Sequence, residues 1–144
     1  MAKYKIEVNE KQLRALSMVC DRYSRLICGQ LDFSVQECCE EAWERRNKTP
    51  EHPHGIGSQG WYDMRREVER HLDELKLLCW DCDRIASYGV GYNEYADMLY
   101  DMHQVIRHQL WLDNPDRSDI TVDASSAMAS GKEELIKVER LEEN

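Results

Sequence analysis

The fold is decided by residues 9–29, whose sequence is NEKQLRALSMVCDRYSRLICG. Asn9 is a favoured N-cap residue, and Gln12 stands three positions later, where a capping box has its second member. Gly29 follows the last apolar position, which is typical of a helix end. This stretch therefore predicts a helix over about residues 10–28.

Two faces of that helix are apolar. One stripe contains Leu13, Leu16, Cys20, Tyr23 and Ile27, and the second contains Ala15, Met18, Val19 and Leu26. A helix with two apolar faces must bury both. In a chain this short we expect the second face to meet another subunit, in a homodimer or a higher homo-oligomer.

Three more helices and two strands are predicted around this first helix. Ser34 and Asn93 are N-cap residues for helices over about residues 34–46 and 93–111, and apolar spacing predicts a helix over 61–82. Residues 3–8 and about 134–141 alternate between apolar and polar, as half-buried strands do. We expect one α+β domain over residues 1–144, mostly helical, with a small antiparallel sheet formed by the two terminal strands.

The net charge of the chain limits the kinds of partner that it can bind. The chain has 144 residues, 19 Lys and Arg against 28 Asp and Glu, and a formal net charge of −9. Such a field repels polymeric nucleic acid, but a few arginines still bind one or two phosphates of a small ligand. No apolar run is long enough to span a membrane and no signal region is evident, so we expect a cytoplasmic protein.

Six cysteines are present, and Cys79-Trp80-Asp81-Cys82 forms a C-x-x-C motif. Cys20, Cys38 and Cys79 occupy apolar helical positions, which favours packing thiols over ligands. A redox motif needs its first cysteine at a helix N-terminus, whereas this one lies near a predicted C-terminal end. Zinc remains an alternative, and its further ligands would be Cys38, Cys39, His52 and His54.

No catalytic constellation is found. His103 and His108 are candidate bases, but no motif places a serine or cysteine nucleophile beside them. We therefore expect a binding protein that is not an enzyme and that needs no cofactor.

The loop Tyr88-Gly89-Val90-Gly91-Tyr92-Asn93 is a candidate ligand site. Glycines let a ligand approach the backbone, Tyr88 and Tyr92 offer rings for stacking on a base, and the next helix presents free N–H groups. Asn93 is a candidate for bonding a base or ribose, although capping the helix competes for its oxygen. An ordinary turn between helices is the alternative.

Besides rings that stack on the base, a nucleotide site needs groups that bind phosphate, and arginines are the candidates here. Arg107 lies in a predicted stripe with Tyr100, His103 and Trp111, an arrangement typical of a phosphate ligand beside stacking rings. An ion pair with an acidic neighbour is its alternative role. Three further candidates are Arg65 in the third helix and Arg22 and Arg25 at the end of the first, where they also complement the helix dipole.

Several segments resemble one group of phage proteins. They are Tyr4–Val8, Asn9–Leu13, Cys28–Gln30, Tyr88–Asn93 and Asp101–His108. Together they resemble the phage anti-Thoeris sponge family, which sequesters cyclic ADP-ribose signals.

The resemblance implies a non-enzymatic sink for a cyclic ADP-ribose isomer made by an infected host's immune enzyme. Members form dimers or hexamers, and some hold cyclic oligonucleotides at separate sites. The family's first pocket has an aromatic ring, an asparagine and an arginine, whose nearest matches here are Tyr88 or Tyr92, Asn93 and Arg107. A second site would lie near Arg22, Arg25 and Gly29.

Two other functions remain open. An acidic phage protein can inhibit a nuclease or CRISPR effector by direct binding, but such a mimic needs carboxylates along one face, and here they alternate with basic residues. A hydrolase of the same nucleotide would need a base and usually a metal site.

Overall fold

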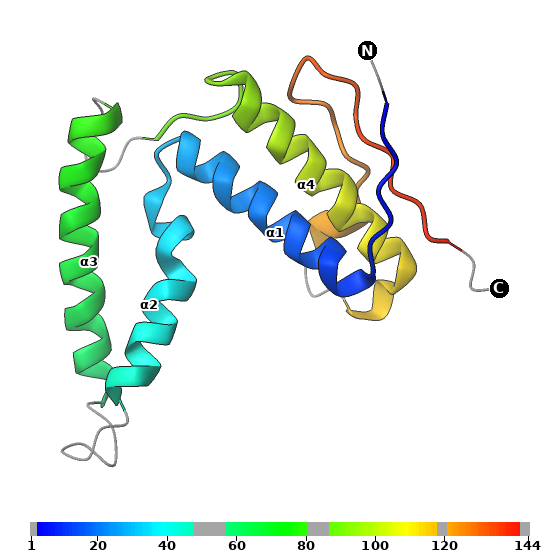
Figure 1. Cartoon of the computed structure of the whole chain (residues 1–144). Helices are drawn as coiled ribbons and strands as arrows, with labels where there is room; N and C mark the ends of the chain where they lie inside the picture. The colour runs from blue at the N-terminus through cyan, green and yellow to red at the C-terminus, as the bar shows by residue number, and fades with distance from the viewer. Residues whose placement is uncertain (1–2, 48–56, 81–86, 118–120, 142–144) are drawn as a thin grey trace. The chain divides into compact units, whose positions relative to one another are not determined.

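The computed structural model describes residues 3–47, 57–80, 87–117 and 121–141, and within these ranges it is mostly helical (Figure 1). The helices are α1 Glu10–Ile27, α2 Leu31–Asn47, α3 Gly57–Trp80 and α4 Glu94–Asp113, with short 3₁₀ turns η1 Pro115–Arg117 and η2 Thr121–Ala124. Among the described helices, none combines the length and apolar character that a membrane span requires.

The chain divides into two compact units. The terminal unit contains residues 1–24 and 89–144, and the central unit contains residues 25–88. The terminal unit therefore holds most of α1 together with α4, η1 and η2, whereas the central unit holds the last turn of α1 with α2 and α3.

The predicted ends of α1 are confirmed. The Asn9 amide donates to Gln12 Oε1 and the Gln12 amide donates to Asn9 Oδ1, each at 2.9 Å, which completes the capping box. At the other end Gly29 has φ of 75°. Its amide donates to the Leu26 carbonyl at 3.0 Å, and the Gln30 amide donates to the Arg25 carbonyl at 2.9 Å. This pair of bonds is a Schellman motif.

In the central unit, the end of α1 is held by Trp80 and Tyr88. The Trp80 indole donates to the Ile27 carbonyl at 2.8 Å, and the Tyr88 amide donates to the Cys28 carbonyl at 2.9 Å. A Cβ built on Gly29 would lie 3.3 Å from the Trp80 ring. Glycine is thus required at position 29 both by its positive φ and by the packed indole.

Two helices begin earlier than the sequence predicts. α2 begins at Leu31 rather than near Ser34, because Leu31 is buried immediately after the glycine turn. α3 begins at Gly57 rather than Trp61, so the glycine-rich segment before Trp61 is partly helical. The Trp61 and Trp43 rings pack edge to face with centroids 5.6 Å apart, which joins the two helices. The predicted end of this helix at Cys82 lies outside the described residues.

In the terminal unit, α1 and α4 are joined by buried polar contacts. Ser24 Oγ donates to the Ala96 carbonyl at 2.8 Å, and Ser17 Oγ lies 2.9 Å from His103 Nδ1. Cys20 and Ile106 are buried, the latter completely. Because both serines are buried, these contacts fix how the two helices sit against each other.

The predicted antiparallel sheet is wrong. Within the described ranges, residues 3–8 and 134–141 are extended but form no strand. Tyr4 and Ile6 are 90% and 80% exposed, so the described residues leave most of the alternating apolar face uncovered. The segments meet through an ion pair of 3.1 Å between Lys3 and Glu134. Alternation indicates only that one face is apolar, and a sheet also needs backbone groups within hydrogen-bonding reach.

The C-terminal segment is instead fixed to α4. Asp101 is buried, and its carboxylate accepts hydrogen bonds from the Ser130 and Gly131 amides, each at 2.8 Å. A Cβ at Gly131 would lie 3.3 Å from that carboxylate. The glycine therefore lets the chain approach α4 closely.

Candidate functional site

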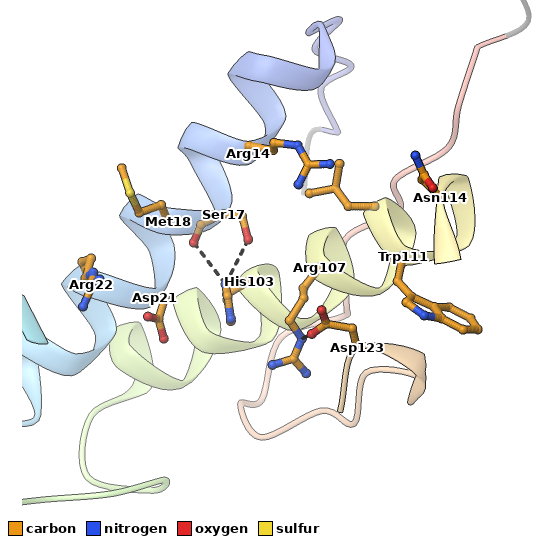
Figure 2. Close-up of a pocket in the computed structure, with 11 residues that line it drawn as sticks. Arg14, Ser17, Met18, Asp21, Arg22, His103, Arg107, Trp111, Asn114 and Asp123 are labelled. Atoms are coloured by element: carbon orange, nitrogen blue, oxygen red, sulfur yellow. Dashed lines mark hydrogen bonds and ion pairs between the residues drawn. The ribbon is translucent and has the colours of Figure 1, made fainter. Parts of the chain in front are cut away.

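A cavity of about 360 Å³ opens in the terminal unit (Figure 2). It lies between one face of α1, one face of α4 and the η2 turn. Its lining consists of Arg14, Ser17, Met18, Asp21 and Arg22 from α1, His103, Arg107, Leu110, Trp111 and Asn114 at α4 and its C-cap, and Asp123 from η2.

Helical spacing explains why these side chains gather. Arg14, Ser17 and Asp21 follow one another at intervals of three and four residues along α1. His103, Arg107 and Trp111 follow at intervals of four along α4. Residues at such intervals share one helix face, so two polar stripes meet across the cavity. The mixed stripe predicted from the sequence for α4 accordingly supplies one wall.

The cavity carries more positive than negative charge. Arg14, Arg22 and Arg107 stand against Asp21 and Asp123, in a chain whose formal net charge is −9. Arginine guanidinium groups bind phosphate and carboxylate through two parallel N–H donors. Arg14 is paired with Glu10 at 2.7 Å and Arg107 with Asp123 at 3.0 Å, so a small anion in this cavity would compete with these carboxylates for the guanidinium groups.

Arg107 forms an ion pair that is largely enclosed. Its Nε lies 3.0 Å from Asp123 Oδ1, and the two side chains are only 21% and 15% exposed. In Figure 2 the guanidinium and the carboxylate face each other at the floor of the drawn site. Low exposure reduces solvent screening, so this pair interacts more strongly than the surface pairs on α3.

His103 is positioned by Ser17. Its Nδ1 lies 2.9 Å from Ser17 Oγ and 3.2 Å from the Ser17 carbonyl oxygen (Figure 2). The ring also lies 6.2 Å from the Tyr100 ring, which leaves the imidazole oriented by neighbours on both helices.

Trp111 and η2 are tied together by His108. The imidazole stacks on the Trp111 indole with centroids 5.9 Å apart, and its Nδ1 donates to the Asp123 carbonyl at 2.9 Å. Asp123 is thus held twice, through its side chain by Arg107 and through its backbone by His108. The η2 turn consequently forms a fixed wall of the cavity.

Two of the residues predicted for a ligand site meet here. Arg22 and Arg107 come from separate helices, and the structure places both in the lining of one cavity. The sequence placed them in two different pockets.

Asn93 and the glycine loop have structural partners. Asn93 Oδ1 accepts from the Tyr95 and Ala96 amides at 2.9 and 3.2 Å, so it is the N-cap of α4. The Gly91 amide donates to both oxygens of the buried Asp97 carboxylate at 3.0 Å. The protein's own groups therefore take the donors that we expected to hold an anion. Tyr92 is 46% exposed and is not part of the cavity lining.

The other predicted site residues belong to the central unit. Tyr88 donates its hydroxyl to the Trp80 carbonyl at 3.1 Å. Arg25 lies over the Phe33 ring at 4.5 Å and donates to Gln30 Oε1 at 2.9 Å. Arg65 lies 5.8 Å from the Trp61 ring centroid. Each of these side chains stabilises its own unit.

The cysteines differ in exposure. Cys20, Cys28 and Cys39 are buried, whereas Cys38 and Cys79 are exposed, so the packing role predicted for these two is wrong. Burial raises the pKa of the Cys20 thiol and, against the opposing charge of Arg65, that of Cys39. Among the residues that the structure describes, no three His, Cys, Asp or Glu side chains are placed to hold a metal. Cys82, His52 and His54, the other expected zinc ligands, fall outside those residues.

The lining residues that sequence reasoning missed include Arg14, Ser17, Asp21 and Asp123. Arg14, Ser17 and Asp21 follow one another at steps of three and four residues. A search for polar stripes on α1 would detect this spacing. Asp123 carries no such signal, because it reaches the cavity from a turn.

The chain was compared with known protein families, sequences and structures. No family model, curated protein sequence or solved structure matches this chain.

Proposed function

We propose that this protein binds a small cyclic nucleotide in the cavity between α1 and α4 and sequesters it without converting it. The cyclic ADP-ribose class is the expected ligand, and the expected setting is the cytoplasm of a phage-infected bacterium, where capture would block an immune signal. The observation that carries the proposal is the meeting of Arg22 and Arg107, from two helices, in one cavity.

Size and chemistry support this choice. The volume of about 360 Å³ lies within the roughly 300–1,000 Å³ of ligand pockets. Arginines supply donors for phosphate oxygens, and the Trp111 indole at the rim supplies a surface for a base. A sponge needs such binding groups in a fixed geometry, and the contacts of His103, Ser17 and Asp123 supply that rigidity.

Titration calorimetry tests the proposal. The panel contains cyclic ADP-ribose isomers, cyclic dinucleotides and trinucleotides, and linear ADP-ribose. We expect one cyclic species to bind, Arg107→Ala to abolish that binding, and Arg22→Ala to weaken it. Arg140→Ala is the matched control, because Arg140 is an exposed arginine of the same unit outside the cavity.

Recovery of the ligand distinguishes a sponge from an enzyme. After heating the complex, an intact cyclic ligand supports sequestration, whereas a cleaved ligand would make the protein a hydrolase. Absence of heat with every member of the panel would refute the proposed function.

We also propose that the protein is a homo-oligomer. Leu16, Val19 and Tyr23 follow one another along α1 and are 40%, 56% and 53% exposed. Exposed apolar stripes of this kind are typical of subunit interfaces. Sedimentation analysis of the purified chain should give a mass above that of the monomer, and Val19→Lys should lower it.

The competing hypothesis, an acidic inhibitor that imitates nucleic acid, receives less support. On α3 the carboxylates are paired with basic neighbours, as in Glu67 with Arg70 at 2.8 Å and Glu69 with Arg65 at 3.5 Å. Paired charges project a weaker field than an uninterrupted acidic row.

A further inference from the structure

A second cavity, of about 440 Å³, opens in the central unit and is separate from the arginine-lined site. Its lining consists of two tryptophans and two glutamates, Trp43, Trp61, Glu40 and Glu44. Both indoles are half-buried and both glutamates are exposed. Tryptophans that served only the packing of α2 on α3 would be expected to be covered, whereas these rings face an opening.

The four side chains share one electrostatic preference. Glu40 and Glu44 are one helical turn apart on α2, with Trp43 between them, so both carboxylates border the indole. The Trp61 ring meets the Trp43 ring edge to face at an interplanar angle of 69°. Indole faces carry negative potential and carboxylates carry negative charge, so these residue types favour a cation over an anion.

The chain itself places a cation near the Trp61 ring. The guanidinium carbon of Arg65 lies 5.8 Å from the Trp61 centroid. The same arginine is paired with Glu69 at 3.5 Å, so its charge is already partly balanced from α3. Arg65 does not line the cavity, which leaves the two α2 carboxylates as its charged walls.

We propose that this cavity binds a small quaternary ammonium ion of the choline type. Two indoles and two carboxylates match a cation whose nitrogen carries methyl groups. The rings contact the methyl groups, and the carboxylates balance the charge. Hard divalent cations are a poor match, since they need six or more oxygen ligands in close contact.

Nuclear magnetic resonance of the full chain, with its tryptophans labelled, tests this proposal. Choline chloride is titrated at constant ionic strength, and the four indole N–H signals are followed. We expect saturable shifts of Trp43 and Trp61 only, while Trp80 and Trp111 stay unchanged. The neutral carbon isostere of choline, dimethylbutanol, should produce no saturable shift.

A charge-removing variant completes the test. Glu44→Gln keeps the shape of the side chain and should weaken choline binding about twofold to fivefold, as expected for an exposed charge pair. Glu41→Gln is the matched control, because Glu41 lies on α2 outside the cavity and pairs with Arg45. Equal binding of the neutral isostere, movement of all four indole signals, unchanged affinity in Glu44→Gln, or no saturation would each overturn the proposal.

Discussion

Arg107 Nε lies 3.0 Å from Asp123 Oδ1, in a contact that joins α4 to η2 inside the arginine-lined cavity. At this position the carboxylate forms the same kind of ion pair with the guanidinium that the phosphate of a ligand would form. The protein's own aspartate therefore competes with any anionic ligand for Arg107, and it also holds the arginine in place.

Removing that carboxylate should strengthen anion binding. In Asp123→Asn the Arg107 guanidinium loses its neutralising partner, so affinity for pyrophosphate, measured by calorimetry, should rise about threefold. The free energy of unfolding should fall by about 1 kcal/mol, because a poorly exposed charge loses its partner. Asp116→Asn, at an exposed residue of η1, should change neither quantity. Weaker pyrophosphate binding in Asp123→Asn would contradict this competition.

The attachment of the C-terminal segment should depend on Asp101. Asp101→Asn replaces a charged acceptor of the Ser130 and Gly131 amides, each bonded at 2.8 Å, by a group with only one acceptor oxygen. Hydrogen bonds to a buried charge contribute about 1.5–3 kcal/mol, so the free energy of unfolding should fall by about 2 kcal/mol. Hydrogen exchange should show faster exchange at these two amides. The exposed Glu133→Gln is the control, and equal protection in both variants would show that Asp101 does not hold the segment.

The pairing of the two chain ends should appear as a shifted titration. A hydrogen bond and the charge of Lys3, together with Lys137, lower the pKa of Glu134 from its ordinary value. A lowered folded-state pKa means that the pairing stabilises the fold above the ordinary glutamate pKa. That stabilisation is lost as the pH falls through the lower, folded-state value.

Carboxyl-carbon magnetic resonance measures this directly. Lys3→Gln should return the pKa of Glu134 towards its ordinary value, whereas Lys5→Gln, which removes the partner of Glu7 at 3.1 Å, should leave it lowered. If the Glu134 titration is identical in the wild type and in Lys3→Gln, the ends do not pair in solution.

Thiol labelling should separate the cysteines by exposure. Among the described cysteines, Cys38 and Cys79 are exposed and should react with iodoacetamide first. Cys20 is 2% exposed, and burial raises its pKa, so it should react only when the protein opens. Peptide mass mapping gives the rates, and labelling in guanidinium provides the reference. Modification of Cys20 as fast as Cys38 under native conditions would contradict the buried position.

Cap signals in the sequence located the helices well. Asn9 with Gln12, Gly29 and Asn93 all act as predicted, since a cap is a hydrogen bond between residues only a few positions apart. The N-terminus of α2 was missed, because it depends on the burial of Leu31 rather than on Ser34.

The candidate site was predictable only in part. The stripe of His103, Arg107 and Trp111 follows from helical spacing, and it does line the cavity. The loop residue Asn93 has the residue type of a ligand contact, but its oxygen caps α4 instead. A residue type alone does not reveal which of two nearby partners a polar atom takes.

By itself, therefore, the sequence determined the local elements: capped amphipathic helices, an acidic and charge-alternating surface, and a stripe of His103, Arg107 and Trp111 on α4. The tertiary structure decided which stripes meet, that Asp123 reaches Arg107, and that the two alternating ends remain unpaired as strands. The physical reason is the separation in sequence between the residues that interact. Caps and helix faces are fixed by neighbours within one or two turns, whereas a cavity or a sheet depends on packing between segments far apart in the chain.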